Sequence, residues 1–366
     1  MRLVYICLQA TRQGQASYAH VHEIIRGLER RGWRVQLFQP SYVNSTREPG
    51  SLRRLIEVAW LQIRALPAIL RADVVYVRAH FAALPASTLA GLRRVPVVQE
   101  LNGPYDDMFI AWPQLKRARR LVVGAQRIQL RRASEVIAVT DGLAEWVRRD
   151  ARPRRIAVVP NGANTDLFSP SGPRRGGMPE RYAGFVGALS GWQGTEIMLR
   201  AVDDPEWPAD HALVVAGDGA GAEAVRRAAS RNSRVVHLGR LPYREIPAVI
   251  RGATVMLSVQ PLIPRTAAGG INPLKVYEAL ACAVPVVVSD LPGQADLVRH
   301  ERCGWVVPPG DAAAVARAVA LAAANPEETA AAGAQGREAV VREHSWEARA
   351  ADTHAVLVKL LEEHRS

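Results

Sequence analysis

The stretch from Gln260 to Asp290 reads QPLIPRTAAGGINPLKVYEALACAVPVVVSD and decides the fold. Two adjacent glycines lead into Asn272-Pro273, which predicts a helix start, because Asn caps free backbone N–H groups and Pro suits the first turn. Pro285 ends the predicted helix, and three valines follow as a short buried strand. A glycine loop, a helix and a buried strand in this order are the parts of an α/β unit.

Two charged residues of the predicted helix face the same side. Lys275 and Glu278 are three residues apart and lie near the positive end of the helix. A glycine loop that feeds a helix start suits an anionic group such as a diphosphate, and Glu278 could accept hydrogen bonds from the vicinal hydroxyls of a sugar. The pattern alone equally allows an ordinary loop followed by a solvated Lys–Glu pair.

Length and composition indicate a two-domain globular chain. Its 366 residues exceed one comfortable core, and 48% of them are hydrophobic and 22% charged. The three cysteines (Cys7, Cys282 and Cys303) lie far apart in apolar contexts, which favours a reduced, cytoplasmic protein without disulfides. The first residues are too short an apolar run for a signal peptide, and no run is long enough to span a membrane.

The net charge of +12 and the pI near 10.3 have two explanations. Either the composition is generally rich in arginine, or the chain is attracted to a polyanion or an anionic bilayer. Residues 112–132 carry seven basic residues and no acid, which predicts an amphipathic helix on an inner membrane surface or a solvated outer helix. Because the chain has no RNP, KH or zinc-finger pattern, we expect no nucleic-acid partner.

The N-terminal residues predict the opening of a doubly wound domain. A strand at Arg2–Leu8 is followed by a loop that ends near Gly14, a helix at 17–31 and a strand at 35–38. In such domains ligands bind beyond the carboxyl ends of the strands. His20 and His22 are two apart on the helix, so we expect both to be partly exposed and not to share a metal.

Polar side chains follow the next two predicted strands. Arg78 and His80 end one strand, and Glu100 and Asn102 end another. Residues at these strand ends point into the ligand crevice, so we predict that they touch an acceptor or the reacting sugar. A polar turn with a capped strand end is the alternative.

The segment NPLKVYEALACAVPVVVSD resembles the signature helix of the retaining GT-B glycosyltransferases of family 4. PNGANTDLFSP at 160–170 resembles the junction between the two domains of that family, and residues 303–311 resemble its G-x-x-V-P-P-G-D motif. The resemblance covers nearly the whole chain and is strongest from Ala183 to Trp346.

The resemblance implies an α/β fold with two Rossmann-like doubly wound domains that face a central cleft (GT-B). It divides the chain into an acceptor-binding domain at 1–170, a donor-binding domain at 171–345 and a helix at 346–366 that crosses back to the first domain. It implies a metal-independent, cofactor-free retaining hexosyltransferase that moves a sugar from a UDP- or GDP-sugar to a hydroxyl of a glycan, lipid-linked or secondary-metabolite acceptor.

The resemblance also completes the predicted sites. The glutamate that corresponds to Glu278 binds the donor ribose in that family. Predicted catalytic residues are Lys275, Glu100 and Asn102, and predicted acceptor-binding residues are Arg78, His80, Glu100 and Asn102. Predicted donor-binding residues are Gly14, Gly187, Gln193, Gly217, Arg240, Arg265, Gly269, Gly270, Asn272, Pro273, Leu274, Lys275 and Glu278.

Four positions depart from the family pattern. Gly270 stands where many members have an acid, and Asn102 where many have a histidine. Ala188 and Gln193 stand where the family usually has the arginine and lysine that hold the donor diphosphate. A UDP-sugar epimerase or hydrolase on the same fold, or a catalytically silent binding subunit, therefore stays an alternative. The sequence leaves donor, acceptor and oligomeric state open.

Overall fold

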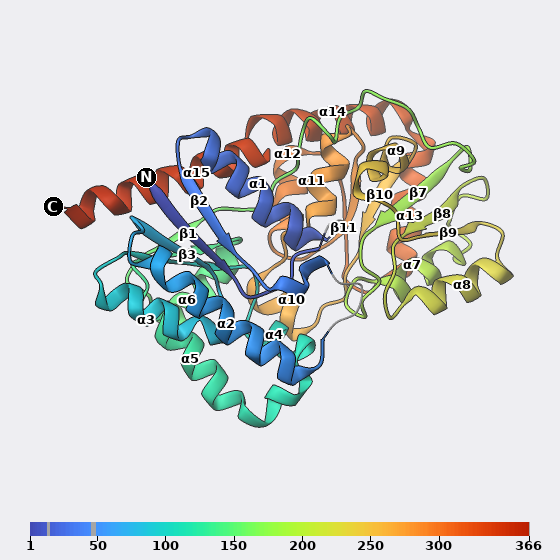
Figure 1. Cartoon of the computed structure of the whole chain (residues 1–366). Coiled ribbons are helices and arrows are strands. Elements are labelled where there is room, and N and C mark those ends of the chain that lie inside the picture. Colours follow the sequence, from blue (N-terminus) through green and yellow to red (C-terminus); the bar gives the residue numbers. More distant parts are fainter. Residues whose placement is uncertain (13–14, 45–48, 366) are drawn as a thin grey trace. The chain divides into compact units, whose positions relative to one another are not determined.

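The structure is a computed structural model that describes residues 1–12, 15–44 and 49–365. The chain divides into two compact units (Figure 1). Unit 1 comprises Met1–Pro160 together with Arg349–Ser366, and unit 2 comprises Asn161–Ala348. Each unit holds one parallel sheet of six strands covered by helices, so the predicted doubly wound α/β class is confirmed.

The sheet of unit 1 has the strand order β2-β1-β3-β4-β5-β6, and all its pairings are parallel. The chain direction along the sheet reverses between β1 and β3, which is the position where ligands bind in doubly wound sheets. The strands are β1 Arg2–Cys7, β2 Arg34–Phe38, β3 Val74–Arg78, β4 Val97–Leu101, β5 Glu135–Ala138 and β6 Ile156–Val158.

Two groups of helices cover this sheet. The helices of the first group pack their buried side chains into apolar clusters with the strands. They are α2 Ser51–Ile69, α3 Leu84–Leu92, α5 Arg119–Arg132 and α6 Asp141–Asp150. A further helix, α1 Ala16–Arg30, packs against the long last helix, α15 Trp346–Arg365. The remaining helical segments are α4 Asp106–Ala111 and the short 3-10 turns η1 Ser41–Asn44, η2 Phe81–Ala83 and η3 Pro113–Ala118.

The sheet of unit 2 has the order β12-β11-β10-β7-β8-β9, again all parallel. Its strands are β7 Tyr182–Val186, β8 Ala212–Ala216, β9 Val235–Gly239, β10 Val255–Ser258, β11 Val286–Ser289 and β12 Gly304–Val307. The chain leaves β7 in one direction for two strands and returns to place β10 on its other side. The expected ligand position is therefore beyond the carboxyl ends of β7 and β10.

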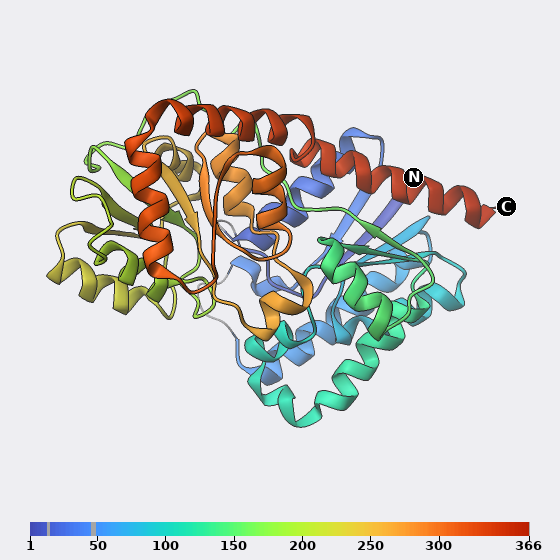
Figure 2. The same cartoon turned by 180° about the vertical axis from the view of Figure 1, so that it is seen from behind.

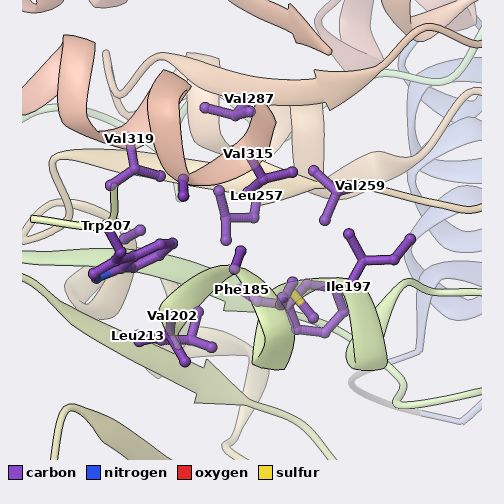
Figure 3. Packing of buried hydrophobic residues seen from close by; sticks show 14 of the residues in the cluster. Phe185, Ile197, Val202, Trp207, Leu213, Leu257, Val259, Val287, Val315 and Val319 are labelled. Carbon is purple, nitrogen blue, oxygen red and sulfur yellow. The ribbon is translucent and has the colours of Figure 1, made fainter. Parts of the chain in front are cut away.

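The helices of unit 2 enclose its apolar clusters. They are α7 Thr195–Val202, α8 Ala222–Arg231, α9 Ile246–Ile250, α10 Pro264–Gly269, α11 Leu274–Ala281, α12 Gln294–Glu301, α13 Ala312–Ala324 and α14 Pro326–Arg342, with the 3-10 turn η4 Tyr243–Glu245. Figure 2 shows α13 in front of the sheet. Between the sheet, α7 and α13, Phe185, Trp207 and Leu257 pack with valines and Ile197 (Figure 3).

Several predicted elements differ from the structure. Residues 112–132 are not one helix, because η3 covers 113–118 and α5 begins only at Arg119. The apolar side of α5 packs into the unit 1 core through Val122, Val123 and Leu130, and its outer face carries arginines together with the exposed Leu121 and Ile128. The loop predicted before Gly270 contains the short helix α10. The unit boundary falls at 160/161, and α15 contributes its first three residues to unit 2.

The helix start at Asn272-Pro273 was also predicted wrongly. Pro273 is extended, with φ −78° and ψ 130°, and the helix α11 begins at Leu274 without a side-chain cap. The Asn272 carbonyl accepts a hydrogen bond of 2.7 Å from the Asn161 amide, and Ile271 forms a β-bridge with Gly293. These contacts keep the chain extended for one residue longer than local preference indicates.

No helix in the described part of the chain is long and apolar enough to cross a membrane.

The close contact between α1 and α15 can be tested by mutation. A Cβ added to Gly27 would lie 2.2 Å from the Ala350 Cβ, so Gly27→Ala should destabilise unit 1 by about 1–3 kcal/mol through overpacking. The double variant Gly27→Ala/Ala350→Gly moves the methyl group to the other helix and should restore most of the loss. Urea unfolding measures both.

The control for this prediction is Gly91→Ala in α3, where an added Cβ meets open space. This change should stabilise the protein by about 0.5–1 kcal/mol, as Ala normally does in a helix. A Gly27→Ala variant that is stabilised to the same degree would contradict the close approach of the two helices.

Candidate functional site

The predicted donor residues gather around the N-terminal turn of α11 in unit 2. The Lys275 Nζ donates a hydrogen bond of 2.8 Å to the Gln193 Oε1 and lies 3.7 Å from the centre of the Phe185 ring. Gly187, which follows β7, has φ +138°, and a Cβ there would lie 3.3 Å from the same Nζ. The Lys275 ammonium therefore occupies the expected ligand position at the carboxyl end of β7.

Burial dominates the titration of Lys275. Loss of solvent lowers its pKa to about 7, and the nearby Glu278 carboxylate opposes that shift. A cation–π contact with Phe185 and one neutral amide oxygen are weaker partners for an ammonium than a hydrogen-bonded carboxylate would be. The structure thus holds a half-buried lysine that is close to its titration midpoint at neutral pH.

Glu278 lies one turn deeper and is 7% exposed. Burial raises its pKa to about 7, while a hydrogen bond of 2.9 Å from the Tyr243 hydroxyl to the Glu278 Oε1 and the charge of Lys275 act in the opposite direction. The described residues contain no ion pair between Lys275 and Glu278, so the solvated pair considered from the sequence is not what the structure shows. The Glu278 Oε2 can accept further hydrogen bonds.

Close backbone contacts shape the loops around this pair. A Cβ on Gly217 would lie 1.9 Å from the Gly187 carbonyl oxygen, and one on Gly194 would lie 1.9 Å from the Val259 carbonyl oxygen. Gly270 has φ +65° and approaches the Pro292 carbonyl, so glycine is required there as well. These approaches bring the loops after β7, β8 and β10 together at one edge of the sheet.

Buried amides fix the loop that leads to α10. Gln294 donates hydrogen bonds of 3.2 Å to the Ser258 carbonyl, 3.1 Å to the Gln260 Oε1 and 2.9 Å to the Ser289 carbonyl. Because these groups are buried, each bond satisfies a polar atom that would otherwise be costly. The start of the stretch from Gln260 is therefore held against β11 and α12.

The other predicted donor residues are distributed unevenly. Leu274 starts α11 and is buried, Gly269 ends α10, and Arg240 is exposed after β9. Gly14 and the side chain of Arg265 lie outside the described residues. Asn272 contributes its carbonyl to Asn161 and does not cap α11.

A second polar cluster lies in unit 1 and centres on Glu100, which is 1% exposed. Its Oε1 accepts hydrogen bonds from Arg78 at 2.8 Å and from Asn102 at 2.5 Å. Its Oε2 lies 2.7 Å from the Tyr76 hydroxyl, 3.3 Å from the Tyr5 hydroxyl and 2.9 Å from the His20 Nε2. Three of the four predicted acceptor residues therefore lie together at the carboxyl ends of β3 and β4.

These partners determine the charge of Glu100. Burial alone would raise its pKa, but His20, Arg78 and Asn102 outweigh that effect and hold the pKa well below its usual range. Both oxygens of the Glu100 carboxylate accept hydrogen bonds, and the carboxylate thereby fixes the positions of the Arg78 and Asn102 side chains. Its predicted catalytic role stays a prediction.

His80 has a local function in the structure. Its Nδ1 accepts a hydrogen bond of 3.2 Å from the Ala82 amide and caps the turn η2, and burial lowers its pKa to about 4. It is therefore neutral at pH 7. Contact with an acceptor stays a prediction for His80.

The sequence did not reveal three of the site's side chains. His20 was expected to be partly exposed and is buried against Glu100, whereas His22 is half-buried as expected. Tyr243 in η4 contacts Glu278, and Phe185 in β7 contacts Lys275. The residues of each pair are far apart in the sequence and are brought together by the fold. An isolated tyrosine or phenylalanine in an apolar run carries no sequence signal of such a contact.

The described residues contain no group of three or more His, Cys, Asp or Glu side chains placed to hold a metal ion. The cysteines are free and buried, and burial raises the pKa of Cys7 to about 11 and of Cys282 and Cys303 to about 12. The charged chemistry of the site therefore rests on Lys275, Glu278 and the Glu100 cluster.

Known families match each half of the chain separately. Residues 19–167 match the family described as Glycosyltransferase Family 4, and residues 180–325 match Glycosyl transferases group 1. Together the two matches include all predicted site residues except Gly14.

Two bacterial enzymes are similar in sequence. The chain is 31% identical over 206 residues to the GDP-mannose-dependent alpha-(1-6)-phosphatidylinositol monomannoside mannosyltransferase of Mycolicibacterium smegmatis, with 53% of each chain covered. It is 29% identical over 214 residues to the 2-deoxystreptamine glucosyltransferase of Streptomyces kanamyceticus, with 54% of each covered. The matched part thus spans about half the length of these curated relatives.

Solved structures resemble the chain over its whole length. The sucrose-phosphate synthase of Thermosynechococcus elongatus has a TM-score of 0.80 at 19% identity and covers 99% of this chain and 100% of its own. Anabaena HepE in complex with UDP has a TM-score of 0.74 at 19% identity, with 98% and 100% covered. These likenesses confirm the predicted GT-B fold.

Proposed function

We propose that this chain, which belongs to the GT-B fold glycosyltransferases of the family 4 type, transfers a sugar with retention of configuration from a UDP- or GDP-sugar to a hydroxyl group. The observation that carries the proposal is the pair Lys275 and Glu278 at the carboxyl end of β7. Among the described residues, the buried carboxylate has one side-chain hydrogen-bond donor, Tyr243, and the half-buried lysine forms no ion pair. A nucleoside diphosphate supplies what each group lacks.

Glu278 is proposed to bind the ribose. Tyr243 occupies the Oε1 of Glu278, so the Oε2 is left to accept hydrogen bonds from the two vicinal hydroxyls of a ribose. Accepting them favours the ionised carboxylate and lowers its raised pKa. The resemblance to HepE, which was solved in complex with UDP, supports a nucleotide-sugar donor.

Lys275 is proposed to face the diphosphate. Negative charge on the leaving phosphate increases in the transition state, and an ammonium at this position stabilises that state more than the bound donor. Because Gly187 and Gly270 carry no side chain, the backbone at these two positions can lie close to the same anion. The resembled family needs no metal for this step, and metal independence is part of the proposal.

The acceptor is proposed to be a hydroxyl compound that meets the Glu100 cluster. Arg78 and Asn102 are held by Glu100 and are the polar groups at that edge of unit 1. The similar enzymes act on a phosphatidylinositol mannoside and on 2-deoxystreptamine, which are polyhydroxylated or amino-substituted ring compounds. A lipid-linked or secondary-metabolite acceptor is the corresponding proposal here.

Calorimetric titration with UDP, GDP and TDP tests the donor proposal. One nucleotide should bind, and Glu278→Ala should weaken its binding by about 1.5–3 kcal/mol, because a hydrogen bond to a buried charged group is lost. The control Glu338→Ala changes an exposed glutamate of α14 and should leave binding unchanged. If none of the nucleotides binds wild-type protein, the chain is a silent subunit. Donor turnover without an acceptor would instead show an epimerase or hydrolase.

Lys275→Ala should lower kcat by about 10²–10³, or ~2.7–4 kcal/mol, with a much smaller loss of donor affinity. Lys275→Arg should recover only part of the rate, because a planar guanidinium does not replace a compact ammonium. Steady-state kinetics with saturating donor measure the change. A near-normal kcat for Lys275→Ala would remove the lysine from the reaction.

From the lowered pKa of Lys275 we expect that the protein takes up a proton when the nucleotide binds. With a pKa of about 7 it is mostly neutral at pH 8 in the free protein, and an adjacent diphosphate raises that pKa. Binding at pH 8 should therefore take up close to one proton, measured by calorimetry in buffers of different ionisation enthalpy. Lys275→Met should bind the nucleotide without this uptake. Equal uptake by both proteins would contradict the assignment.

Activity should survive dialysis against EDTA. The proposed mechanism uses Lys275 and backbone N–H groups for the charge of the leaving group, so removal of divalent ions should change kcat by less than about twofold. An enzyme that loses activity on chelation and regains it with magnesium or manganese would disprove metal independence.

A further inference from the structure

The outer face of α2 exposes a continuous apolar stripe. Seven large hydrophobic side chains on or just after this helix are 38–72% exposed: Leu52, Leu55, Ile56, Trp60, Ile63, Leu66 and Leu70. They recur at intervals of three and four residues, so they lie on one side of the helix. The opposite side is buried against the sheet through residues such as Val58, Leu61 and Ala65. The helix thus has two apolar faces, and its own domain covers only one.

A row of arginines follows one edge of this stripe. Arg53, Arg64 and Arg71 are eleven and seven residues apart, or about three and two turns, which places them along one side of the helix and its C-terminal turn. Trp60 lies between the stripe and this row by the same spacing. Glu57, the one acid of α2, lies on the same edge, seven residues before Arg64, and accepts a hydrogen bond from the Ser41 hydroxyl. The edge therefore carries three arginines and one glutamate and is cationic on balance.

The last two of these arginines line a groove of about 350 Å³ between α2 and the amino ends of β1 and β2. Arg2 and Arg34 line its other side, so four arginines surround it. In the described part of the chain, none of the four guanidinium groups has an ion pair with a carboxylate. This edge of the sheet is opposite to the carboxyl ends, where the Glu100 cluster lies.

The structure assigns this surface to an anionic phospholipid bilayer. The apolar stripe of α2 lies in the interface between headgroups and acyl chains, with Trp60 at its boundary, and the four-arginine groove receives lipid phosphates. A helix with an apolar stripe and a cationic edge suits a flat anionic surface with an apolar interior better than a polar protein surface. The net charge of +12 adds long-range attraction to such a bilayer.

This assignment replaces the segment 112–132 that the sequence favoured for membrane contact. The apolar side of α5 is used in the core, whereas the stripe of α2 remains exposed. The inference is independent of the sugar and acceptor proposed above, and its test needs no enzyme assay.

Sedimentation of the full-length protein with vesicles tests the assignment. Wild-type protein should bind vesicles that contain phosphatidylglycerol and bind pure phosphatidylcholine much more weakly. Arg64→Gln/Arg71→Gln should reduce the partition coefficient on anionic vesicles roughly twentyfold, at about fivefold for each arginine. Ile56→Ser/Ile63→Ser should reduce it at least about tenfold by removing buried apolar area.

The matched control is Arg148→Gln/Arg149→Gln, which removes the same charge from exposed positions in α6. It should retain binding within about threefold, because α6 packs on β5 and β6 at the far end of the sheet from β1 and β2, and charges farther than a Debye length from the contact are largely screened. All substituted side chains are exposed, so thermal unfolding should be unchanged and should verify that each variant is folded.

Three results would overturn the assignment. The first is wild-type protein that stays in the supernatant with anionic vesicles or binds both vesicle types equally. The second is a control pair that loses as much binding as the groove pair, which would mean diffuse charge attraction. The third is a stable dimer in lipid-free ultracentrifugation that Ile56→Ser/Ile63→Ser dissociates, because a second copy of the chain would then cover the stripe.

Discussion

Both sheets are parallel and covered on both faces, and this constraint decides where an ionisable group can lie. The interiors of β3, β7, β10 and β11 are almost entirely apolar, because a charge between two helical layers has no water and few donors. Charged side chains therefore appear where strands end and loops begin. Lys275 meets β7 at such an end, and Arg78 is the last residue of β3. Glu100 is the exception, since it lies inside β4 and needs hydrogen bonds from several side chains.

Glu100 and Glu278 differ in how far their hydrogen-bonding capacity is satisfied within the protein. Both are almost fully buried, yet the pKa of Glu100 is lowered and that of Glu278 is raised. The difference lies in the partners, because both oxygens of Glu100 are occupied, whereas Glu278 has the Tyr243 hydroxyl on one oxygen. A buried polar group that lacks partners costs folding free energy, and a ligand with hydroxyl donors recovers it. Such an arrangement is typical of a site that is completed by its ligand.

Local pattern predicted the elements well and the contacts between them poorly. Hydrophobic periodicity located β1, α1 and β2 to within one residue at each end, because each depends on neighbouring residues. The start of α11 was placed one residue early, since Asn161 and Gly293 hold the preceding segment extended and lie far away in the sequence. His20 was misjudged for the same reason, as its partner Glu100 is eighty residues further along. The resemblance to a family predicted roles for Glu278 and Lys275. It did not predict the Tyr243 hydroxyl that contacts Glu278 or the Phe185 ring that contacts Lys275.

The neutral residue at position 193 changes more than the number of cations in the site. A lysine there, as in the resembled family, would bring a second ammonium toward Lys275, and two like charges in a site with little water would further disfavour protonation of either. Gln193 instead presents its amide oxygen 2.8 Å from the Lys275 Nζ, which orients the group without repelling it. The positive field of two cations is thereby replaced by one group whose pKa burial lowers. An adjacent anion raises that pKa, so the charge of the site depends on the ligand that occupies it.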